Sequence, residues 1–410
     1  MLPAPPVRQP LRITAAVLIA LAIFTAGLLV GRRGRTTPPS SSTAVPTSGQ
    51  STSTTVTGTP QTRAPATTLP SGPQLAPGIA APFDTKVNFP ELTANPTPTL
   101  WVAAGTTGGE GSKTKPFGSI NQALSTAQAG DVIMVGAGSY TELVRSVRDG
   151  EASRPIRLIG ADGASLTPLA PTDRLVQFDH RYLTLEGFRL SGADKLLWLQ
   201  KTKGVRVLRN TFESGGGECI RLKYFATDNE VAKNTIKGCG KVNFDYPAGT
   251  HKNGEGIYIG TAPEQLISKN PTPEPDASDR NWIHDNIIET KAECVDIKEG
   301  ASANLIQANR CTGQIDPDGS AFDSRGNGNY FIANAATSVV GAGVRLGGDT
   351  KEDGQNNVVI GNELRSTGGY AVKLENPSQR AVCGNTIGDN AAGSASRKNG
   401  APIYRPEAPC

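Results

Sequence analysis

The sequence is 410 residues long, which permits two or three domains. Its 47 glycines and 30 prolines, with only 5% aromatic residues, are typical of a turn-rich β protein with a flexible region and argue against a helical bundle. The formal net charge of +4 is too small to indicate nucleic-acid binding, and we expect none.

The first predicted element is a membrane-spanning segment at residues 13–31. It has no charged residue and is bounded by Arg12 on one side and by Arg32 and Arg33 on the other. This length is sufficient to cross a bilayer and exceeds the apolar core of a usual signal peptide. We therefore expect a cytoplasmic amino terminus at residues 1–12, a single-pass anchor in the cell membrane and an extracellular carboxy-terminal part. The alternative is a cleaved signal peptide, which would make the protein secreted.

Residues 32–97 are dominated by Ser, Thr, Pro, Gly and Ala. This composition cannot bury enough apolar surface to fold, so it predicts a disordered linker. The folded domain is then expected at residues 98–410. Near its start, Ser119 is suited to cap a helix, and Ile120 and Ala123 follow at helical spacing. We interpret this helix as a cap over one end of the core.

Beyond this helix the sequence repeats. An asparagine that follows a short apolar pair recurs at intervals of 24, 52, 23, 25, 28 and 23 residues, and the longest interval holds two periods. A period near two dozen residues with short strands predicts a solenoid of coils. Asparagine amides can hydrogen-bond to one another in a stack, and asparagine tolerates the left-handed turn conformation, so we assign these residues a structural role. They are Asn210, Asn234, Asn286, Asn309, Asn334, Asn362 and Asn385.

All six cysteines lie in the second half of the chain. An even number of cysteines in an exported protein favours disulfides, and no two have the CxxC spacing of a zinc site. Several connectivities are possible from sequence alone. The spacing favours three local pairs, which are Cys219 with Cys239, Cys294 with Cys311, and Cys383 with Cys410.

Short segments of alternating polarity recur with the same period, as in strands that have one buried face. Stacking them in order gives two columns of outward-facing side chains, which we call the outer strip and expect to be exposed to solvent. The first column contains Arg221, Tyr258, Asp296, Asp323, Arg345 and Lys373. The second column, two residues along, contains Lys223, Gly260, Lys298, Arg325, Gly347 and Glu375.

Two groups of motifs carry a family resemblance. The domain opens with Trp101-Val102, Lys115-Pro116-Phe117, Gly138-Ser139-Tyr140 and Pro155-Ile156-Arg157. This opening resembles the amino-terminal coils of the pectate-lyase-like superfamily, which implies an all-β, right-handed parallel β-helix. Further along, the chain from Glu293 to Lys298, then Asp323-Ser324-Arg325 and Gly343-Val344-Arg345 resemble the polysaccharide lyase family of chondroitinase B and alginate lyases. The likeness covers roughly residues 100–390.

The resemblance implies a calcium-assisted β-elimination that cleaves a uronate-containing acidic polysaccharide. In that family a lysine removes the proton next to the uronate carboxylate, and an arginine assists at the leaving oxygen. Lys298 matches the catalytic lysine and Arg325 the arginine. Substrate-binding roles are expected for other members of the outer strip, which are Arg345, Arg221, Lys223, Tyr258 and Asp323.

The resemblance also implies a Ca²⁺ site. Glu293, five residues before Lys298, matches one acidic ligand of the ion. The family usually has a second acid two residues before that position, but this chain has Lys291 there. Asp296 and Glu255 are the candidate replacements, because Ca²⁺ prefers hard oxygen ligands.

The residue types suit this reaction independently of the resemblance. Removing a proton next to a carboxylate creates an enolate, which a metal ion or a guanidinium stabilises. A lysine can act as the base only if its pKa falls toward the working pH; neighbouring cations would lower the pKa of Lys298, whereas Asp296 would raise it.

Several alternatives remain open. Asp296 and Asp323, on adjacent coils, suit the acid and base of a glycoside hydrolase. The same proton abstraction would serve a C5 epimerase, and the outer strip would also suit a glycan-binding module without catalysis. Insertions at residues 241–254 and 262–280 are expected to wall one side of the groove. The histidines are expected to be structural, and the protein to be monomeric.

Overall fold

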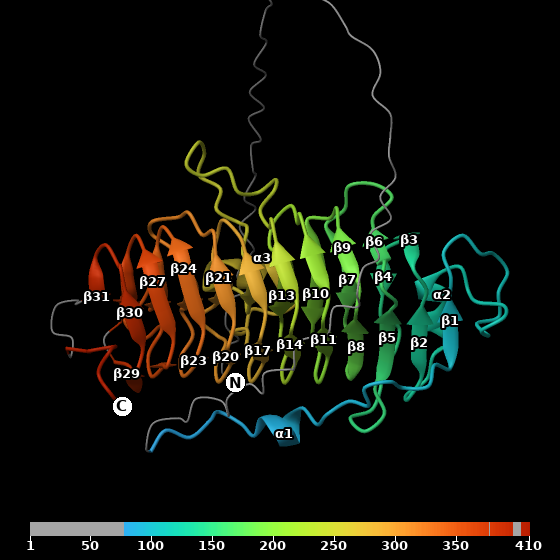
Figure 1. Cartoon of the computed structure of the whole chain (residues 1–410), viewed down its shortest axis with the longest axis horizontal. Helices are drawn as coiled ribbons and strands as arrows, with labels where there is room; N and C mark the ends of the chain where they lie inside the picture. The colour runs from blue at the N-terminus through green and yellow to red at the C-terminus, as the bar shows by residue number, and fades with distance from the viewer. Residues whose placement is uncertain (1–77, 377, 397–402) are drawn as a thin grey trace, which may run out of the picture. The chain divides into compact units, whose positions relative to one another are not determined.

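The computed structural model describes residues 78–376, 378–396 and 403–410 (Figure 1). The predicted cytoplasmic segment, the predicted membrane anchor at 13–31 and most of the predicted linker lie outside these residues. Within the described ranges, no helix is both long and apolar enough to cross a membrane. The anchor therefore stays a prediction.

The described chain folds as an all-β parallel solenoid, as the repeats predict. Three sheets run along it, and in each sheet the strands follow one another in sequence order (Figure 1). Each full coil adds one strand to every sheet. Neighbouring strands pair in parallel, as the registers of residues 220–222 with 257–259 and of 257–259 with 295–297 illustrate.

The sheets contain 11, 10 and 10 strands and are named sheets A, B and C. Sheet A contains β1 (Leu100–Val102), β2 (Val132–Val135), β5 (Ile156–Gly160), β8 (Leu183–Glu186), β11 (Arg206–Leu208), β14 (Glu230–Ala232), β17 (Trp282–His284), β20 (Leu305–Gln307), β23 (Tyr330–Ile332), β26 (Val358–Ile360) and β29 (Ala381–Cys383). Sheet B contains β3 (Gly138–Thr141), β6 (Ala164–Thr167), β9 (Arg189–Ser191), β12 (Thr211–Glu213), β15 (Thr235–Lys237), β18 (Ile287–Glu289), β21 (Arg310–Thr312), β24 (Ala335–Val339), β27 (Glu363–Thr367) and β30 (Thr386–Gly388). Sheet C contains β4 (Val144–Arg145), β7 (Arg174–Phe178), β10 (Lys195–Gln200), β13 (Ile220–Lys223), β16 (Ile257–Ile259), β19 (Val295–Ile297), β22 (Ser320–Ser324), β25 (Ala342–Leu346), β28 (Tyr370–Leu374) and β31 (Gly393–Ala395).

The helices among the described residues are short. The predicted helix is present as α2 (Ile120–Thr126), with the Ser119 side chain accepting a hydrogen bond from the Gln122 backbone, and it packs against β1, β2 and β4. Its role as a cap over the core stays a prediction. The insertion at 262–280 contains the 3₁₀ helix η1 (Pro263–Gln265) and α3 (Leu266–Lys269).

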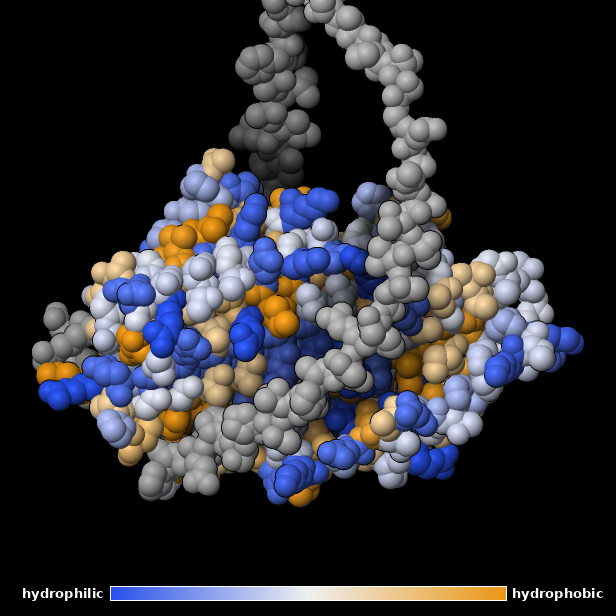
Figure 2. All heavy atoms as spheres, viewed as in Figure 1, coloured by the Kyte–Doolittle hydropathy of each residue, from blue (hydrophilic) through white to orange (hydrophobic). Residues whose placement is uncertain are grey.

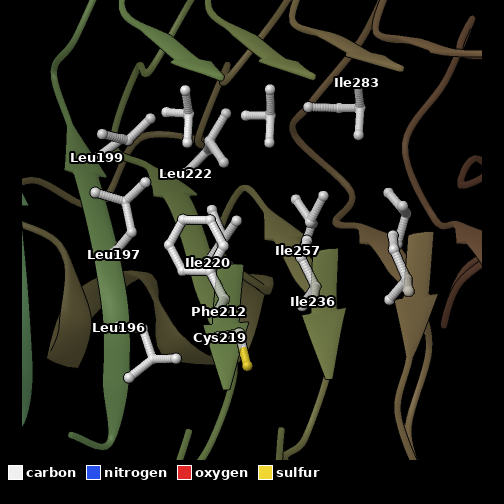
Figure 3. Packing of buried hydrophobic residues seen from close by; sticks show 14 of the residues in the cluster. Leu196, Leu197, Leu199, Phe212, Cys219, Ile220, Leu222, Ile236, Ile257 and Ile283 are labelled. Atoms are coloured by element: carbon white, nitrogen blue, oxygen red, sulfur yellow. The ribbon is translucent and has the colours of Figure 1, made fainter. Parts of the chain in front are cut away.

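The core consists of apolar side chains that repeat at equivalent positions of successive coils. Leu197, Ile220, Ile257 and Val295 lie in register on sheet C, and each is fully buried. Figure 3 shows the first three side by side within the solenoid. Such stacking removes apolar surface from water in every coil, and truncating one of these side chains to alanine typically costs about 2–5 kcal/mol.

The predicted asparagines form a continuous buried ladder at the bend between sheets A and B. Each donates from Nδ2 to the Oδ1 of the next, for example Asn286 to Asn309 at 2.9 Å and Asn309 to Asn334 at 3.0 Å. The structural role is therefore confirmed. One detail of the prediction is wrong, because the left-handed residue is the one before the asparagine, such as Ala308 and Ala333.

The structure contains a second asparagine ladder, which was not predicted from the sequence. It lies five residues before the first ladder in five successive coils, where Asn281 donates to Asn304 at 2.9 Å and Asn304 to Asn329 at 3.1 Å. Its signal in the sequence is the recurring pair of asparagines five residues apart, as in Asn304 and Asn309.

All three predicted disulfides are present. They join Cys219 to Cys239, Cys294 to Cys311 and Cys383 to Cys410, and no cysteine of the chain is left free. Each bond joins positions that are close in sequence, which is why spacing alone identified the partners.

The structure contradicts part of the predicted disordered linker at residues 78–98, which we call the strap. They lie along sheet A and contain α1 (Thr85–Asn88), capped by Asp84 (Figure 1). Phe89 packs against Trp282, with ring centroids 5.6 Å apart. The Arg157 guanidinium donates to the Thr93 carbonyl at 2.8 Å. The predicted disordered linker therefore does not extend over residues 78–97, because sheet A offers these residues apolar and cationic partners.

The surface of the described domain is mixed in polarity. Figure 2 shows hydrophilic residues over much of the middle of the face in view, interrupted by scattered apolar residues. Isolated exposed apolar residues are normal on protein surfaces. The polarity of the surface alone therefore does not locate a site.

Candidate active site on sheet C

The structure brings the first column of the outer strip together in the predicted order. On the outer face of sheet C, Arg221 pairs with Tyr258, Tyr258 with Asp296, Asp296 with Asp323, Asp323 with Arg345, and Arg345 with Lys373. These residues share the outer face because side chains alternate between the two faces of a strand. The residues on either side of each one therefore point into the core. The register of this column is confirmed.

The second column follows directly after the strands. Its backbone continues the ladder: Lys298 N–H donates to Ile259 C=O at 2.9 Å, and Arg325 N–H donates to Ile297 C=O at 2.8 Å. Lys298 and Arg325 therefore lie on adjacent coils, about 5 Å apart along the solenoid by ordinary strand spacing.

One expectation about the outer strip is wrong. The strip was predicted to be exposed to solvent, but Lys223 is only 1% exposed, Asp323 1%, Asp296 3% and Lys298 8%. The insertion at 262–280 covers part of it, as the Lys223 ammonium donates to the carbonyl of Lys269 on α3 at 2.6 Å. Burial raises the cost of every unpaired charge, so the pairing of these groups becomes the central question.

Most charges of the strip are paired at close range. Lys298 Nζ lies 2.7 Å from Asp296 Oδ2, and Arg345 Nη2 lies 2.7 Å from Asp323 Oδ2. Arg221 Nη1 lies 2.6 Å from Oε1 of Glu218, which lies just before β13.

Arg325 is held more loosely than these cations. Its Nη1 is 3.4 Å from Glu299 Oε1 and 3.3 Å from Asp349 Oδ1, and its side chain is 23% exposed. Its contacts are longer than those of Lys298, Arg345 and Arg221, so Arg325 is more able than these three to turn to a ligand. Burial lowers its pKa, but the carboxylates of Asp296 and Asp323 raise it by more, so it stays a guanidinium.

The three predicted metal ligands come together. One carboxylate oxygen each from Glu255, Glu293 and Asp296 lies within 4.8 Å of the others. Glu255 and Glu293 meet because the coils pair just before β16 and β19, where Gly256 N–H donates to Glu293 C=O. Gly319 leaves room for this cluster, since a Cβ there would lie 2.5 Å from Glu293 Oε1.

The donor set fits a hard divalent cation such as Ca²⁺. Burial and the carboxylates of Asp296 and Asp323 raise the pKa of Glu293 to about 7, and burial and its acidic neighbours raise the pKa of Glu255 well above its ordinary value. Asp296 Oδ1 is buried with no hydrogen-bond partner among the described groups. Three crowded carboxyl groups of this kind are stabilised when a cation neutralises them, and oxygen ligands suit Ca²⁺.

Lys298 lies in a cage of acidic and aromatic groups. Its Nζ is 4.8 Å from the centre of the Tyr258 ring as well as 2.7 Å from Asp296. Burial lowers the pKa of Lys298, but the charges of Asp296 and its other acidic neighbours outweigh burial, so the net pKa is raised. The structure thus answers the question that the sequence left open, and in this arrangement Lys298 is an ammonium ion.

Sequence reasoning missed the aromatic and cationic residues that extend the first column toward the amino terminus. Trp198 pairs in register with Arg221, and Gln177 pairs with Trp198. The Arg174 guanidinium lies 3.8 Å from the centre of the Trp198 ring, and the Arg221 guanidinium lies 3.7 Å from that of Tyr258. The signal in the sequence is weak, because Leu196, Leu197, Trp198 and Leu199 form an apolar run in which Trp198 is not distinguished from core residues.

The two carboxylates of the alternative hydrolase mechanism are adjacent, but each already pairs with a cation. Asp296 and Asp323 pair in register on β19 and β22. Each has a cation within 2.7 Å, Lys298 for the first and Arg345 for the second. Neither carboxylate is therefore free to protonate a leaving group or to activate water without first breaking an ion pair.

His284 and a groove beside sheet C lie apart from these residues. His284 is buried on sheet A between Glu230 at 3.0 Å and Asp285 at 2.8 Å, in agreement with a structural role. A groove of about 960 Å³ borders sheet C at Asp194 but includes no member of the outer strip. Its lining has no carboxylate cluster, so we place the candidate site on the strip and not in the groove.

The comparisons support the fold: the described chain is a parallel β-solenoid of the kind that an alginate lyase of known structure also has. Among solved structures it is similar to the alginate lyase from Paenibacillus sp. str. FPU-7, with a TM-score of 0.56 and 22% identity over 68% of this chain and 95% of that chain. It is also similar to pectate lyase Pel9A, with a TM-score of 0.49 and 13% identity over 73% of this chain and 78% of that one. A third match is the GH136 lacto-N-biosidase from Eubacterium ramulus, with a TM-score of 0.46 and 11% identity over 73% of this chain and 68% of that one.

These likenesses support the fold alone. The identity is too low to transfer an activity, and the two lower TM-scores carry no argument. No protein-family model matches the sequence, and a comparison with curated proteins finds no match. The function must therefore be argued from the site.

Proposed function

We propose that the protein is an extracellular lyase that cleaves a uronate-containing polysaccharide by β-elimination. One observation carries the proposal: a buried lysine, Lys298, lies between a phenol and a cluster of three carboxyl groups, with Arg325 on the next coil. The three disulfides support export, and the membrane anchor at 13–31 would hold the domain at the cell surface.

In the proposed reaction, Lys298 removes the proton at C5 of the uronate. The electron pair of that bond forms the C4–C5 double bond, the bond from C4 to the glycosidic oxygen breaks, and a proton is delivered to that oxygen. Arg325 stabilises the negative charge that develops on the carboxylate. Because Arg325 holds its proton firmly, Tyr258 is the better donor to the leaving oxygen, and burial raises the pKa of Tyr258 so that it is a neutral phenol before it donates.

Lys298 must be neutral before it can take a proton, and Asp296 opposes this. Glu255, Glu293 and Asp296 would hold a divalent cation, which would neutralise the charge that raises the pKa of Lys298 and would polarise the uronate carboxylate. Tyr258 limits the access of water to the amine, since it is only 4% exposed and lies against Lys298.

The test is incubation of the full-length chain with alginate, pectate and glycosaminoglycans, with Ca²⁺ or with a chelator. We expect ultraviolet absorbance from the unsaturated uronyl end, and a loss of roughly 10²–10⁴-fold in rate for Lys298→Met. The matched control is Lys373→Met, a lysine at the far end of the first column that pairs with Glu375 at 3.0 Å. It should keep full activity.

The result also separates the alternatives. New reducing ends without absorbance would favour hydrolysis by Asp296 and Asp323, which lie in register on adjacent strands. Exchange of the C5 proton without cleavage would favour an epimerase. Binding without any of these signals would favour a glycan-binding module.

A further inference from the structure

A small cavity lies between the strap and the outer face of sheet A, and therefore on a different sheet from the outer strip. Its walls are residues 91–94 of the strap together with side chains of β5, β11 and β14 and of the bends that follow β11 and β14. Its volume is about 230 Å³. This is below the roughly 300–1,000 Å³ of sites for drug-sized molecules, so a small chemical group would fill it.

The lining of the cavity carries more positive than negative charge. Four lining residues are cationic, namely Arg157, Arg206, Arg209 and Lys233. Two are acidic, Glu91 and Glu230, which leaves a formal excess of two positive charges. Glu230 is already shared by two partners, since it pairs with Arg206 and lies 3.0 Å from His284 Nε2. Glu91 is exposed and makes no ion pair within the described part of the chain.

The buried donors beside the cavity are incompletely satisfied. Arg157 and Arg209 both pair with one carboxylate, that of Glu186. Arg157 is 5% exposed, and its Nε is buried with no hydrogen-bond partner among the described groups. Thr184, which lies between Arg157 and Arg206 in the register of sheet A, has a buried hydroxyl that is likewise without a partner among these groups. Buried donors of this kind are costly unless an acceptor meets them.

The backbone does not require cations at this place. Arg209 and Lys233 occupy the bend before the first asparagine ladder, in the left-handed conformation with φ of 55° and 58°. Later coils have Ala308 and Ala333 at the equivalent position, with φ of 53° and 54°. Alanine therefore fits the bend. The arginine and the lysine of two consecutive coils instead have in common that both line the cavity.

We propose that the cavity under the strap binds a phosphate or sulfate group, with Arg157, Arg206 and Arg209 as its ligands. This inference goes beyond the proposed lyase reaction, because the site lies on sheet A and uses no residue of the outer strip. A planar guanidinium donates two parallel hydrogen bonds and so matches the oxygens of such a group. A doubly charged oxyanion also balances the formal excess of two positive charges, which chloride or a single carboxylate does not.

The bound group would also fix the strap. Arg157 donates to the Thr93 carbonyl at 2.8 Å, and Arg206 donates to the Pro90 carbonyl at 2.6 Å. These two arginines thus join the strap to sheet A and line the cavity at the same time. An anion held between them would limit their movement and that of residues 90–94.

The experiment is calorimetric titration of the full-length chain with inorganic phosphate, with inorganic sulfate and with chloride at matched ionic strength. We expect one equivalent of phosphate or sulfate to bind and chloride not to bind. Arg209→Ala should weaken the binding roughly tenfold. This variant is structurally conservative, because alanine fits the bend and Glu186 keeps Arg157 as its partner.

Three further variants make the test specific. Arg365→Ala removes an arginine on sheet B that is similarly exposed and pairs with one carboxylate, Glu363 at 2.7 Å, and it should change no affinity. Glu91→Gln removes a negative charge from the lining and should strengthen binding roughly two- to threefold. Arg209→Lys keeps the charge without the planar fork and should recover only part of the loss.

Two measurements locate the site and identify the source of the anion. Hydrogen–deuterium exchange at residues 91–94 should slow when phosphate is added to the wild type and should change less in Arg209→Ala. Binding of glycerol 3-phosphate as tightly as phosphate would assign the site to a phosphate group carried on a larger molecule. Binding of the inorganic ion alone would assign it to the free anion.

The proposal fails under three outcomes. They are no binding of either oxyanion, equal affinity of wild type and Arg209→Ala, and an equal response to chloride, which would show only a general effect of salt on the charged residues. None of these outcomes depends on whether the chain cleaves a polysaccharide.

Discussion

Two sets of buried polar side chains run along this solenoid, one inside the coils and one on sheet C. The first asparagine ladder satisfies its own hydrogen bonds: Asn309, for example, accepts from Asn286 and donates to Asn334 and to the Ile283 carbonyl. The outer strip does not, because Asp296 Oδ1, Asp323 Oδ1, Arg221 Nε and Arg345 Nε are buried with no hydrogen-bond partner among the described groups.

The difference separates a structural network from a functional one. A buried network that is fully satisfied fixes the shape of the fold, whereas each unsatisfied buried group is a cost that the fold must offset elsewhere. In natural proteins, unsatisfied buried polar groups occur mainly where a ligand binds to them. On this argument, changes in the ladder should reduce stability and leave chemistry intact, whereas changes in the strip should reduce activity even when stability is restored.

The largest expected effect on stability belongs to the ladder. Asn309→Leu removes the acceptor of two Asn286 donors and the donor to the Ile283 carbonyl. Leaving these buried groups unsatisfied should lower the free energy of unfolding by about 3–6 kcal/mol, measured by chemical denaturation. The control is Asn253→Ala, at an exposed asparagine. Normal stability of Asn309→Leu would contradict the structural role, as would a selective loss of specific activity in the folded protein.

Replacing one member of a charge pair in the strip should lower stability more than replacing both members. Asp323→Ala alone leaves Arg345 largely buried without its carboxylate and should cost about 3–5 kcal/mol. The double variant Asp323→Leu with Arg345→Leu should recover most of that stability and still have reduced activity. Thermal unfolding and the lyase assay together test this. Full activity in the double variant would show that the pair is only structural.

Much of this comparison could be predicted from the sequence, because both networks follow the period of the coils. Strand parity placed Arg221, Tyr258 and Asp296 in one column, and the repeat placed Asn286 above Asn309. Local spacing also identified the disulfides. These features depend on one coil and its neighbours, and a sequence period contains that information.

The remaining features depend on contacts that have no period. The outer strip is buried because an insertion covers it through Lys269, and nothing in the repeat indicates where an insertion folds back. The strap was assigned to the linker because its composition resembles that of residues 32–77, yet Phe89 packs against Trp282 on sheet A. The high pKa of Lys298 arises from its distance to Asp296, which sequence does not give.

Calcium should affect the strip and leave the ladder unchanged. At a Ca²⁺ concentration about 100 times the dissociation constant, binding to Glu255, Glu293 and Asp296 should raise the free energy of unfolding by about 2.7 kcal/mol. Glu293→Gln should abolish this gain, whereas Asn309→Leu should keep it on a lower baseline. Differential scanning calorimetry with Ca²⁺ or chelator measures both. An equal gain in Glu293→Gln would place the cation elsewhere.

The smallest expected effect concerns the pH dependence that Lys223 contributes. Its pKa is about 8 in the folded protein against an ordinary value of 10.5, mainly because of burial and Arg221. Between these two pH values the unfolded chain holds a proton that the folded chain has released, so this group makes stability rise with pH. The difference in unfolding free energy between wild type and Lys223→Met should therefore change in favour of wild type by about 1 kcal/mol per pH unit from pH 8 to 10. Arg174, Lys269 and Asp276 also act on this ammonium but are present in both proteins, so the difference isolates Lys223. A difference that stays constant with pH would contradict the lowered pKa of Lys223 and would mean that an anion compensates its charge in the folded protein.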